Sequence, residues 1–171
     1  ISSAESIGEQ AFRSCKALTS FSIPASVKII GDDAFYDCTG LNNLRIEDST
    51  TPLMIGYTYE STYEYGPFYD SPLTTIYCGR DIKQVDDDGV EKAADGWEEG
   101  VFANKHDKLT AINLGGKLTK IQPYMFARTE ATSVWIPHII TNIGDYAFKY
   151  CDKLLGITMG YDGLTQFPTI G

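Results

Sequence analysis

The chain has 171 residues, 43% of them hydrophobic and 22% charged, and a formal net charge of -9 at pH 7. That length is enough for one domain with a sizeable core. The negative charge argues against nucleic acid and an anionic membrane surface as partners, because the sequence offers no basic patch to neutralise phosphates. No apolar run approaches the ~20 residues that a membrane-spanning helix needs.

A phrase of 23 residues opens the chain, repeats at once and returns near the end. The first copy places small and apolar residues at fixed offsets: Ile7, Gly8, Ala11, Phe12, Cys15, Leu18, Phe21 and Ile23. The second copy repeats each of them 23 residues later, with Leu44 in place of Phe21, and the last copy begins at Ile143. A period of roughly 20–30 residues with apolar residues at set offsets is typical of a solenoid, in which each repeat packs on its neighbours.

Within one copy, the order of residues predicts a strand, a turn and a corner. Residues 18–23 end in alternating apolar and polar side chains, as expected of a short strand with one buried face. Pro24 ends that strand, because proline lacks the amide that a ladder needs. Residues 27–30 supply a second inward-facing stretch. Residues 31–35 then turn the chain into a short helical or 3-10 corner, with the Phe35 ring in the core.

Applied to the whole chain, this template recovers six turns. The corner positions are Phe12, Phe35, Phe68, Phe102, Phe126 and Phe148. The first inward strand positions are Phe21, Leu44, Ile76, Ile112, Val134 and Ile157. The second inward positions are Ile23, Ile46, Cys78, Leu114, Ile136 and Met159. We therefore expect a β-rich α/β repeat fold, with short parallel strands in one curved sheet on the concave face.

Two steps between the inward strand positions are longer than the others. Leu44 to Ile76 spans 32 residues and Ile76 to Ile112 spans 36, against 22 or 23 elsewhere. The extra residues fall near 57–66 and 86–100, at the same place in consecutive repeats. Insertions in repeat proteins map to one face, often the binding face, so we expect these two to lie side by side.

Residues 1–171 are predicted to form a single domain. The chain opens and closes within a copy of the phrase, and neither end has the polar surface of a capping repeat. It also has no initiator Met and no signal-like start. We therefore expect a fragment of a longer protein.

The four cysteines follow the repeat. Cys15, Cys38 and Cys151 share one slot after the corner Phe, and Cys78 takes an inward strand position. They are expected to be reduced, buried thiols that act as small apolar residues. A disulfide between Cys15 and Cys38 is the alternative, since stacked copies bring the two close together. No C-x-x-C element is present, so neither a zinc site nor a cofactor is expected.

A row of outward-facing positions lies between the two inward ones. It comprises Ser22, Arg45, Tyr77, Asn113, Trp135 and Thr158. Tyr and Trp are enriched at recognition hot spots, so Arg45, Tyr77, Asn113 and Trp135 are the first candidates for ligand binding on the concave face. The alternative is that Tyr77 and Trp135 are scattered surface aromatics.

The two insertions offer weaker candidates. The first is rich in tyrosines that could provide rigid contact area: Tyr57, Tyr59, Tyr63 and Tyr65. Their alternation also fits a hairpin packed on the flank of the solenoid. The second insertion is acidic between Asp86 and Glu99. It lacks an acid at Gln84 that a calcium-binding EF-hand would need, so we expect a solvated loop and no metal site.

Catalysis has little support in this sequence. His106 and His138 are the only histidines and fall at unlike positions of the repeat. No H-E-x-x-H, G-x-S-x-G or phosphate-binding glycine loop is present. Paired carboxylates for glycoside hydrolysis stay open, because Asp and Glu are plentiful. We expect a protein that is not an enzyme.

The phrase IGxxAFxxCxxLxxFxIPxSVxxIG, residues 7–31, closely resembles the BspA-like leucine-rich repeat family. The resemblance is strong over residues 1–47 and 134–159 and weaker between them. Besides the insertions, the departures are Thr129 in the cysteine slot and His138 in place of a serine. The resemblance implies a right-handed leucine-rich-repeat solenoid in a secreted or surface-anchored bacterial protein, often with adhesin-like binding, and it carries over no catalytic residue.

The leading hypothesis is a non-catalytic recognition module that binds a protein or glycan through the concave sheet face or the insertions. The alternatives are a structural spacer in a larger surface protein and a fragment of a glycan-processing enzyme. Neither nucleic acid nor direct membrane insertion is expected. The sequence does not name the ligand, and fold alone does not imply function.

Overall fold

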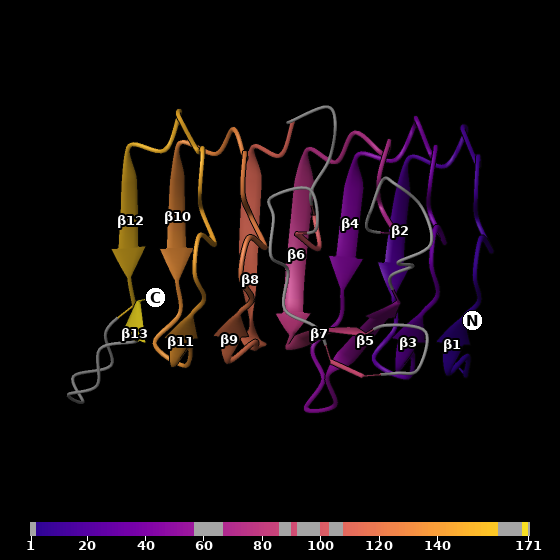
Figure 1. Cartoon of the computed structure of the whole chain (residues 1–171), viewed down its shortest axis with the longest axis horizontal. Coiled ribbons are helices and arrows are strands. Elements are labelled where there is room, and N and C mark those ends of the chain that lie inside the picture. The colour runs from indigo at the N-terminus through magenta and orange to yellow at the C-terminus, as the bar shows by residue number, and fades with distance from the viewer. Residues whose placement is uncertain are drawn as a thin grey trace.

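The computed structural model describes residues 3–56, 67–85, 90–91, 100–102, 108–160 and 169–170. The tyrosines of the first predicted insertion, Tyr57, Tyr59, Tyr63 and Tyr65, lie outside these residues, as does most of the acidic one. The regular structure in the described part of the chain consists of short strands. They stack along one long axis, with β1 and β13 at opposite ends (Figure 1).

The longer strands form one row of parallel neighbours. A four-stranded sheet contains β2 (Ser20–Ile23), β4 (Asn43–Ile46), β6 (Thr75–Arg80) and β8 (Ala111–Lys117). A two-stranded sheet continues the row with β10 (Ser133–Ile136) and β12 (Gly156–Met159). Figure 1 shows all of them side by side and pointing the same way. We call the outward side of this row the strand face; it corresponds to the predicted concave face.

A second row follows the second inward stretch of each copy. One sheet contains β1 (Ser6–Ile7), β3 (Ile29–Ile30), β5 (Leu53–Gly56) and β7 (Ile82–Val85). The other contains β9 (Lys120–Ile121), β11 (Asn142–Ile143) and β13 (Thr169–Ile170). Gly56 pairs with Val85 in this row, so β5 and β7 end at neighbouring positions.

The predicted register of the inward positions is confirmed. Across the four-stranded sheet, the first inward positions pair in the order Phe21, Leu44, Ile76 and Ile112. The second inward positions pair in the order Ile23, Ile46, Cys78 and Leu114. In the two-stranded sheet, Val134 pairs with Ile157. The 23-residue period thus brings equivalent side chains into contact, and the core is one continuous cluster along the axis.

The prediction of a single six-stranded sheet is wrong, because β8 and β10 lie side by side without ladder bonds. The link between their repeats also differs from the others. The Thr129 hydroxyl donates to the carbonyl of Leu109, whereas the equivalent Ser71 donates to the corner Phe35 of the repeat before it. The fourth and fifth repeats are therefore joined at a different point, and the strand ladder stops there.

The predicted helical corners are also wrong. Residues 9–14 and 32–37 are turns, in which the amide of Phe12 donates to Ala34 O at 2.8 Å and that of Ser14 to Tyr36 O at 2.8 Å. Alternate corner amides thus bond to the next repeat and are not available for the i→i−4 bonds of a helix. Left-handed residues recur in the corners of Phe12, Phe35, Phe68, Phe126 and Phe148 to allow this, such as Asp33 (φ 52) and Asp37 (φ 56).

The predicted corner phenylalanines form a continuous stack inside these turns. Their ring centroids are separated by 5.1, 5.4, 6.0, 5.6 and 5.6 Å along the series Phe12, Phe35, Phe68, Phe102, Phe126 and Phe148. Phe21 adds contacts to Phe12 and Phe35 at 5.0 and 4.9 Å. Stacked and tilted aromatic pairs at these distances stabilise beyond the area that they bury.

The cysteine slot has a polar role that the sequence analysis missed. The Cys38 thiol donates to Phe12 O at 3.0 Å, and the Cys151 thiol donates to Phe126 O at 3.3 Å. Ser71 makes the same link to Phe35 O at 2.7 Å. The slot therefore takes a small side chain with a hydrogen to donate, which explains why serine or threonine can replace cysteine there.

The expectation that all four thiols are buried is wrong for Cys15 and holds only in part for Cys151. All four cysteines are free; Cys38 and Cys78 are buried, Cys151 is half-buried, and Cys15 is exposed. Burial raises the pKa of the Cys38 and Cys151 thiols and raises that of Cys78 to about 12. The alternative of a Cys15–Cys38 disulfide is not adopted in this structure.

Phe35→Ala is expected to lower the free energy of unfolding by roughly 3–5 kcal/mol, because Phe35 is fully buried and touches three other rings. Phe12 is only partly buried and touches two rings, so Phe12→Ala should cost less. Urea denaturation of both variants measures the difference. A loss below about 1 kcal/mol for Phe35→Ala would contradict a core role for the stack.

In the native protein at pH 8, one thiol, Cys15, is expected to react rapidly with a thiol reagent, because the thiolate is the reactive form and only Cys15 is exposed. Cys38 and Cys78 should react slowly. Unfolding without reductant should release four thiols, the number in the sequence. Mass spectrometry of the alkylated protein identifies the residues, and equal rates at Cys15 and Cys78 would contradict the assignment.

Candidate binding surface on the strand face

The strand face brings together the predicted row of outward positions. Ser22 pairs with Arg45, Arg45 with Tyr77, and Tyr77 with Asn113 across β2, β4, β6 and β8. Trp135 lies beyond the ladder break and pairs with Thr158 on β12. Strand alternation explains the row, because the residues on either side of each member point into the core.

Tyr77 is held by its neighbours and is not a free aromatic surface. Its hydroxyl donates to Asp48 Oδ2 at 2.8 Å, and the Arg45 guanidinium lies 4.0 Å from its ring centroid. The hydrogen bond to Asp48 is the main reason that the pKa of Tyr77 is raised, and burial adds to it. The three side chains form a cluster that braces β4 against β6, with the Arg45 charge stacked on the ring.

A glycine makes room for this cluster. A Cβ on Gly115 would lie 2.5 Å from the Tyr77 hydroxyl and 2.7 Å from Asp48 Oδ1. Any side chain at this position of β8 would therefore displace the tyrosine or the carboxylate. Asn113, also on β8, is exposed, and its amide donates to Ile76 O at 3.2 Å. Three of the four predicted candidates thus have partners within the protein.

Trp135 differs from the other candidates because 54% of its surface is exposed. Its ring lies beside Gly160, where an added Cβ would come within 2.9 Å of Trp135 Cζ2. The flanking Val134 and Ile136 are 2% and 1% exposed. The indole is therefore fixed at its base by the core and presented outward on β10.

Arg80 is the polar residue that the sequence analysis missed. It is fully buried at the end of β6, and its guanidinium donates to three carbonyls of the turn that follows β2. The distances are 2.9 Å to Pro24 O, 3.2 Å to Ala25 O and 2.8 Å to Val27 O. Burial lowers the pKa of Arg80 from its ordinary value. The side chain reaches across the intervening repeat, so it is a structural brace.

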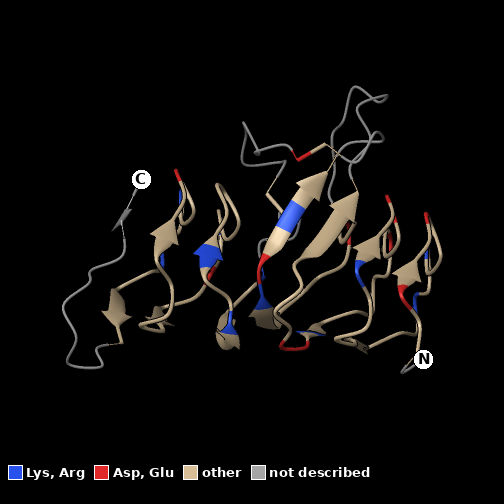
Figure 2. Ribbon diagram, turned by 90° about the horizontal axis from the view of Figure 1, so that it is seen from below, with Lys and Arg blue, Asp and Glu red and all other residues tan. Residues whose placement is uncertain are grey.

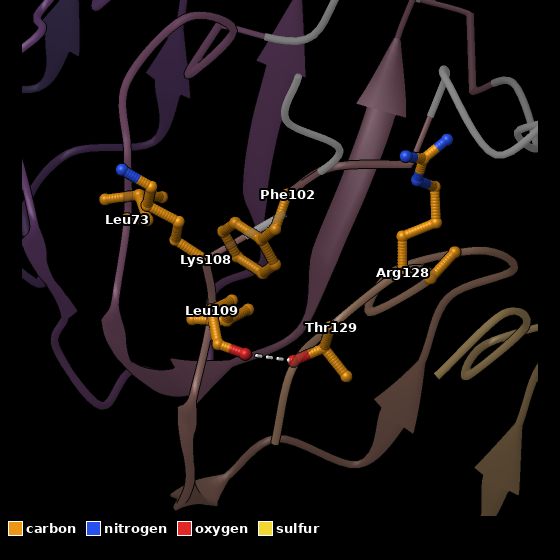
Figure 3. Close-up of a pocket in the computed structure, with 7 residues that line it drawn as sticks. Leu73, Phe102, Lys108, Leu109, Arg128 and Thr129 are labelled. Carbon is orange, nitrogen blue, oxygen red and sulfur yellow. Dashed lines mark hydrogen bonds between the residues drawn. The ribbon is translucent and has the colours of Figure 1, made fainter. Parts of the chain in front are cut away.

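A shallow pocket opens beside the break between β8 and β10. Its apolar lining is Leu73, Phe102, Leu109 and Ala127, and the space of about 270 Å³ is continuous with solvent. Figure 3 shows Lys108 and Arg128 on opposite sides of it and Thr129 bonded to Leu109. The enclosed space is only about 10 Å³, room for a single water molecule, and no titratable pair converges on it.

The remaining surface offers neither a metal site nor a basic patch within the part of the chain that the structure describes. No three His, Cys, Asp or Glu residues of that part lie close enough to hold a metal ion. Lys and Arg are dispersed along the ribbon and do not gather on one face of it (Figure 2). None of the described residues forms a helix long and apolar enough to span a membrane.

Comparison with known proteins agrees with this architecture. The family model of the BspA type leucine rich repeat region matches residues 5–95 and 94–169, in six copies. That number equals the turns predicted from the corner phenylalanines. No curated protein and no solved structure matches the chain with significance.

Arg80→Met is expected to lower the free energy of unfolding by at least about 2 kcal/mol, because three carbonyls of the turn after β2 lose their donor. Lys83→Met, on the exposed side of the next strand, is the control and should change little. Chemical denaturation measures both. An equal loss of unfolding free energy in the two variants would contradict the bracing role of Arg80.

Proposed function

Because the chain belongs to the BspA-type leucine-rich repeat family, we propose that it is a non-catalytic recognition module that binds a protein or glycan through the strand face. The repeat-based architecture supports an interaction role. Family resemblance supports a secreted or surface-anchored bacterial protein with adhesin-like binding, in which the solenoid is right-handed. The observation that carries the proposal is the exposed, core-anchored Trp135 on β10.

The geometry favours Trp135 as the centre of the contact. Rigid aromatic side chains lose little conformational entropy on binding, and Trp is among the most frequent hot-spot residues. Exposed Ser133 and Thr158 lie beside it and can add hydrogen bonds. The same face continues beyond the gap between β8 and β10 through Arg45, Tyr77 and Asn113. Because these side chains already have partners within the protein, they form a polar border around the contact and do not act as separate anchoring residues.

The arrangement gives no support to catalysis. The polar residues of the strand face are engaged in bracing, and the described residues bring no nucleophile and base together on it. A spacer role is the rival proposal. It would leave an exposed tryptophan on this face without a purpose, whereas a recognition module requires such a group.

Trp135→Ala is expected to weaken binding of the natural ligand by about 1–3 kcal/mol with little change in stability, because the indole contributes surface that only a partner can bury. A protein and glycan array screened with the whole chain identifies the ligand. Titration calorimetry of the variant then measures the loss. Normal binding by Trp135→Ala would refute the strand-face proposal.

Tyr77 serves as a matched control on the same face. Tyr77→Phe removes the bond to Asp48 but keeps the ring under Arg45, so we expect a stability loss of about 1 kcal/mol. Ligand affinity should change less than in Trp135→Ala. Thermal unfolding measures the stability of the two variants, and calorimetry measures their ligand affinity. Together they distinguish a residue that stabilises the fold from one that contacts the ligand.

A further inference from the structure

A second aromatic surface lies on the corner side of the last two repeats, away from the strand face. Tyr146 and Tyr150 belong to the turn between β11 and β12 and are 56% and 57% exposed. Tyr124 of the preceding corner packs on Tyr146 with a centroid distance of 5.0 Å. We call this set, with Lys149, the corner platform.

Tyr146 and Tyr150 are exposed although their backbone conformation disfavours them, whereas Tyr124 is only 7% exposed and packs against Tyr146. Tyr124, Tyr146 and Tyr150 all have left-handed backbone, with φ of 54, 58 and 60°. Bulky side chains rarely adopt this conformation, whereas glycine, asparagine and aspartate adopt it more readily. The equivalent slots near the start of the chain hold Gln10, Asp33, Ser14 and Asp37. Unfavourable residues held on a surface point to a function there.

Lys149 supplies a positive charge at the centre of the platform. Its ammonium lies 4.6 Å from the Tyr146 centroid, 5.0 Å from that of Tyr150 and 5.7 Å from that of Tyr124. No carboxylate among the described residues forms an ion pair with it. The equivalent residue of the first copy, Arg13, is neutralised by Asp33. The positive charge of the last corner therefore has no ion-pair partner among the described residues, whereas the equivalent charge of the first corner is neutralised by its own partner.

Lys149 and the exposed rings of Tyr146 and Tyr150 thus lie together on one corner. Charge-assisted bonds from lysine or arginine are the strong contacts available to a carboxylate, and a tyrosine face can stack on the C–H side of a sugar ring.

We propose that the corner platform binds a glycan with an isolated carboxylate, such as a terminal acidic sugar. Tyr146 and Tyr150 would stack on its rings while Lys149 receives the carboxylate. The net charge of -9 disfavours a densely charged polymer, because the whole protein repels it while only Lys149 attracts it. This inference uses residues away from the strand face and does not rest on the proposed function.

The test compares 3′-sialyllactose with lactose, titrated into the whole chain and followed by NMR or calorimetry. Sialyllactose should bind at least about tenfold more tightly than lactose, and less tightly as salt rises, because the carboxylate makes the charged contact. Tyr146→Asn and Lys149→Gln should each weaken it about tenfold. Tyr146→Asn should also melt at the same or a higher temperature, since asparagine suits the left-handed backbone.

Two controls make the outcome specific. Gln10→Asn changes the same slot at the other end of the solenoid, and Trp135→Ala removes the strand-face aromatic; neither should alter sialyllactose binding. The proposal is overturned if sialyllactose binds no better than lactose, or if Trp135→Ala weakens it as much as Tyr146→Asn. A large drop in melting temperature for Tyr146→Asn would also overturn it, by showing that the ring has a structural role. Capture of an acidic peptide without any sugar binding would reject the glycan class.

Discussion

Adjacent repeats are joined by interactions that all run along the solenoid axis, and the remaining structure is arranged around them. The phenylalanine stack repeats at 5.1–6.0 Å, close to the ~4.8 Å between hydrogen-bonded strands. Strand hydrogen bonds, corner amides and aromatic rings can therefore all contact the next repeat at a similar spacing. A single repeat would leave all of these groups without partners, so the stability of the solenoid comes from contacts between neighbouring repeats.

This shared pitch explains the corner as well as the core. The amides of Phe12 and Ser14 must face the next repeat to donate, so the corner backbone takes left-handed conformations at Gln10 and Ser14. A small donor such as Cys38, Ser71 or Cys151 then ties its corner to the Phe carbonyl of the one before. Thr129 instead donates to Leu109, and the strand ladder ends between the same two repeats.

The interior side chains are thus used for stacking between repeats, and the two binding surfaces that we propose lie on the outside of the repeats. On the strand face, Tyr77 is bonded inward, while Trp135 remains exposed on a rigid strand. On the corner, Tyr146 and Tyr150 beside Lys149 occupy left-handed positions that favour other residues. A solenoid can carry both surfaces because a residue that faces solvent does not alter the contacts between repeats.

The sequence by itself determined the period, the corner phenylalanines and the register of the inward positions, because a repeated pattern of side chains decides which of them are buried. It also located the outward row that contains Trp135. Only the tertiary structure decided that the corners are turns, that Arg80 braces Pro24 and that Asp48 engages Tyr77. Each of these depends on a partner more than 20 residues away, and a hydrogen bond between distant residues leaves no periodic signal in either segment.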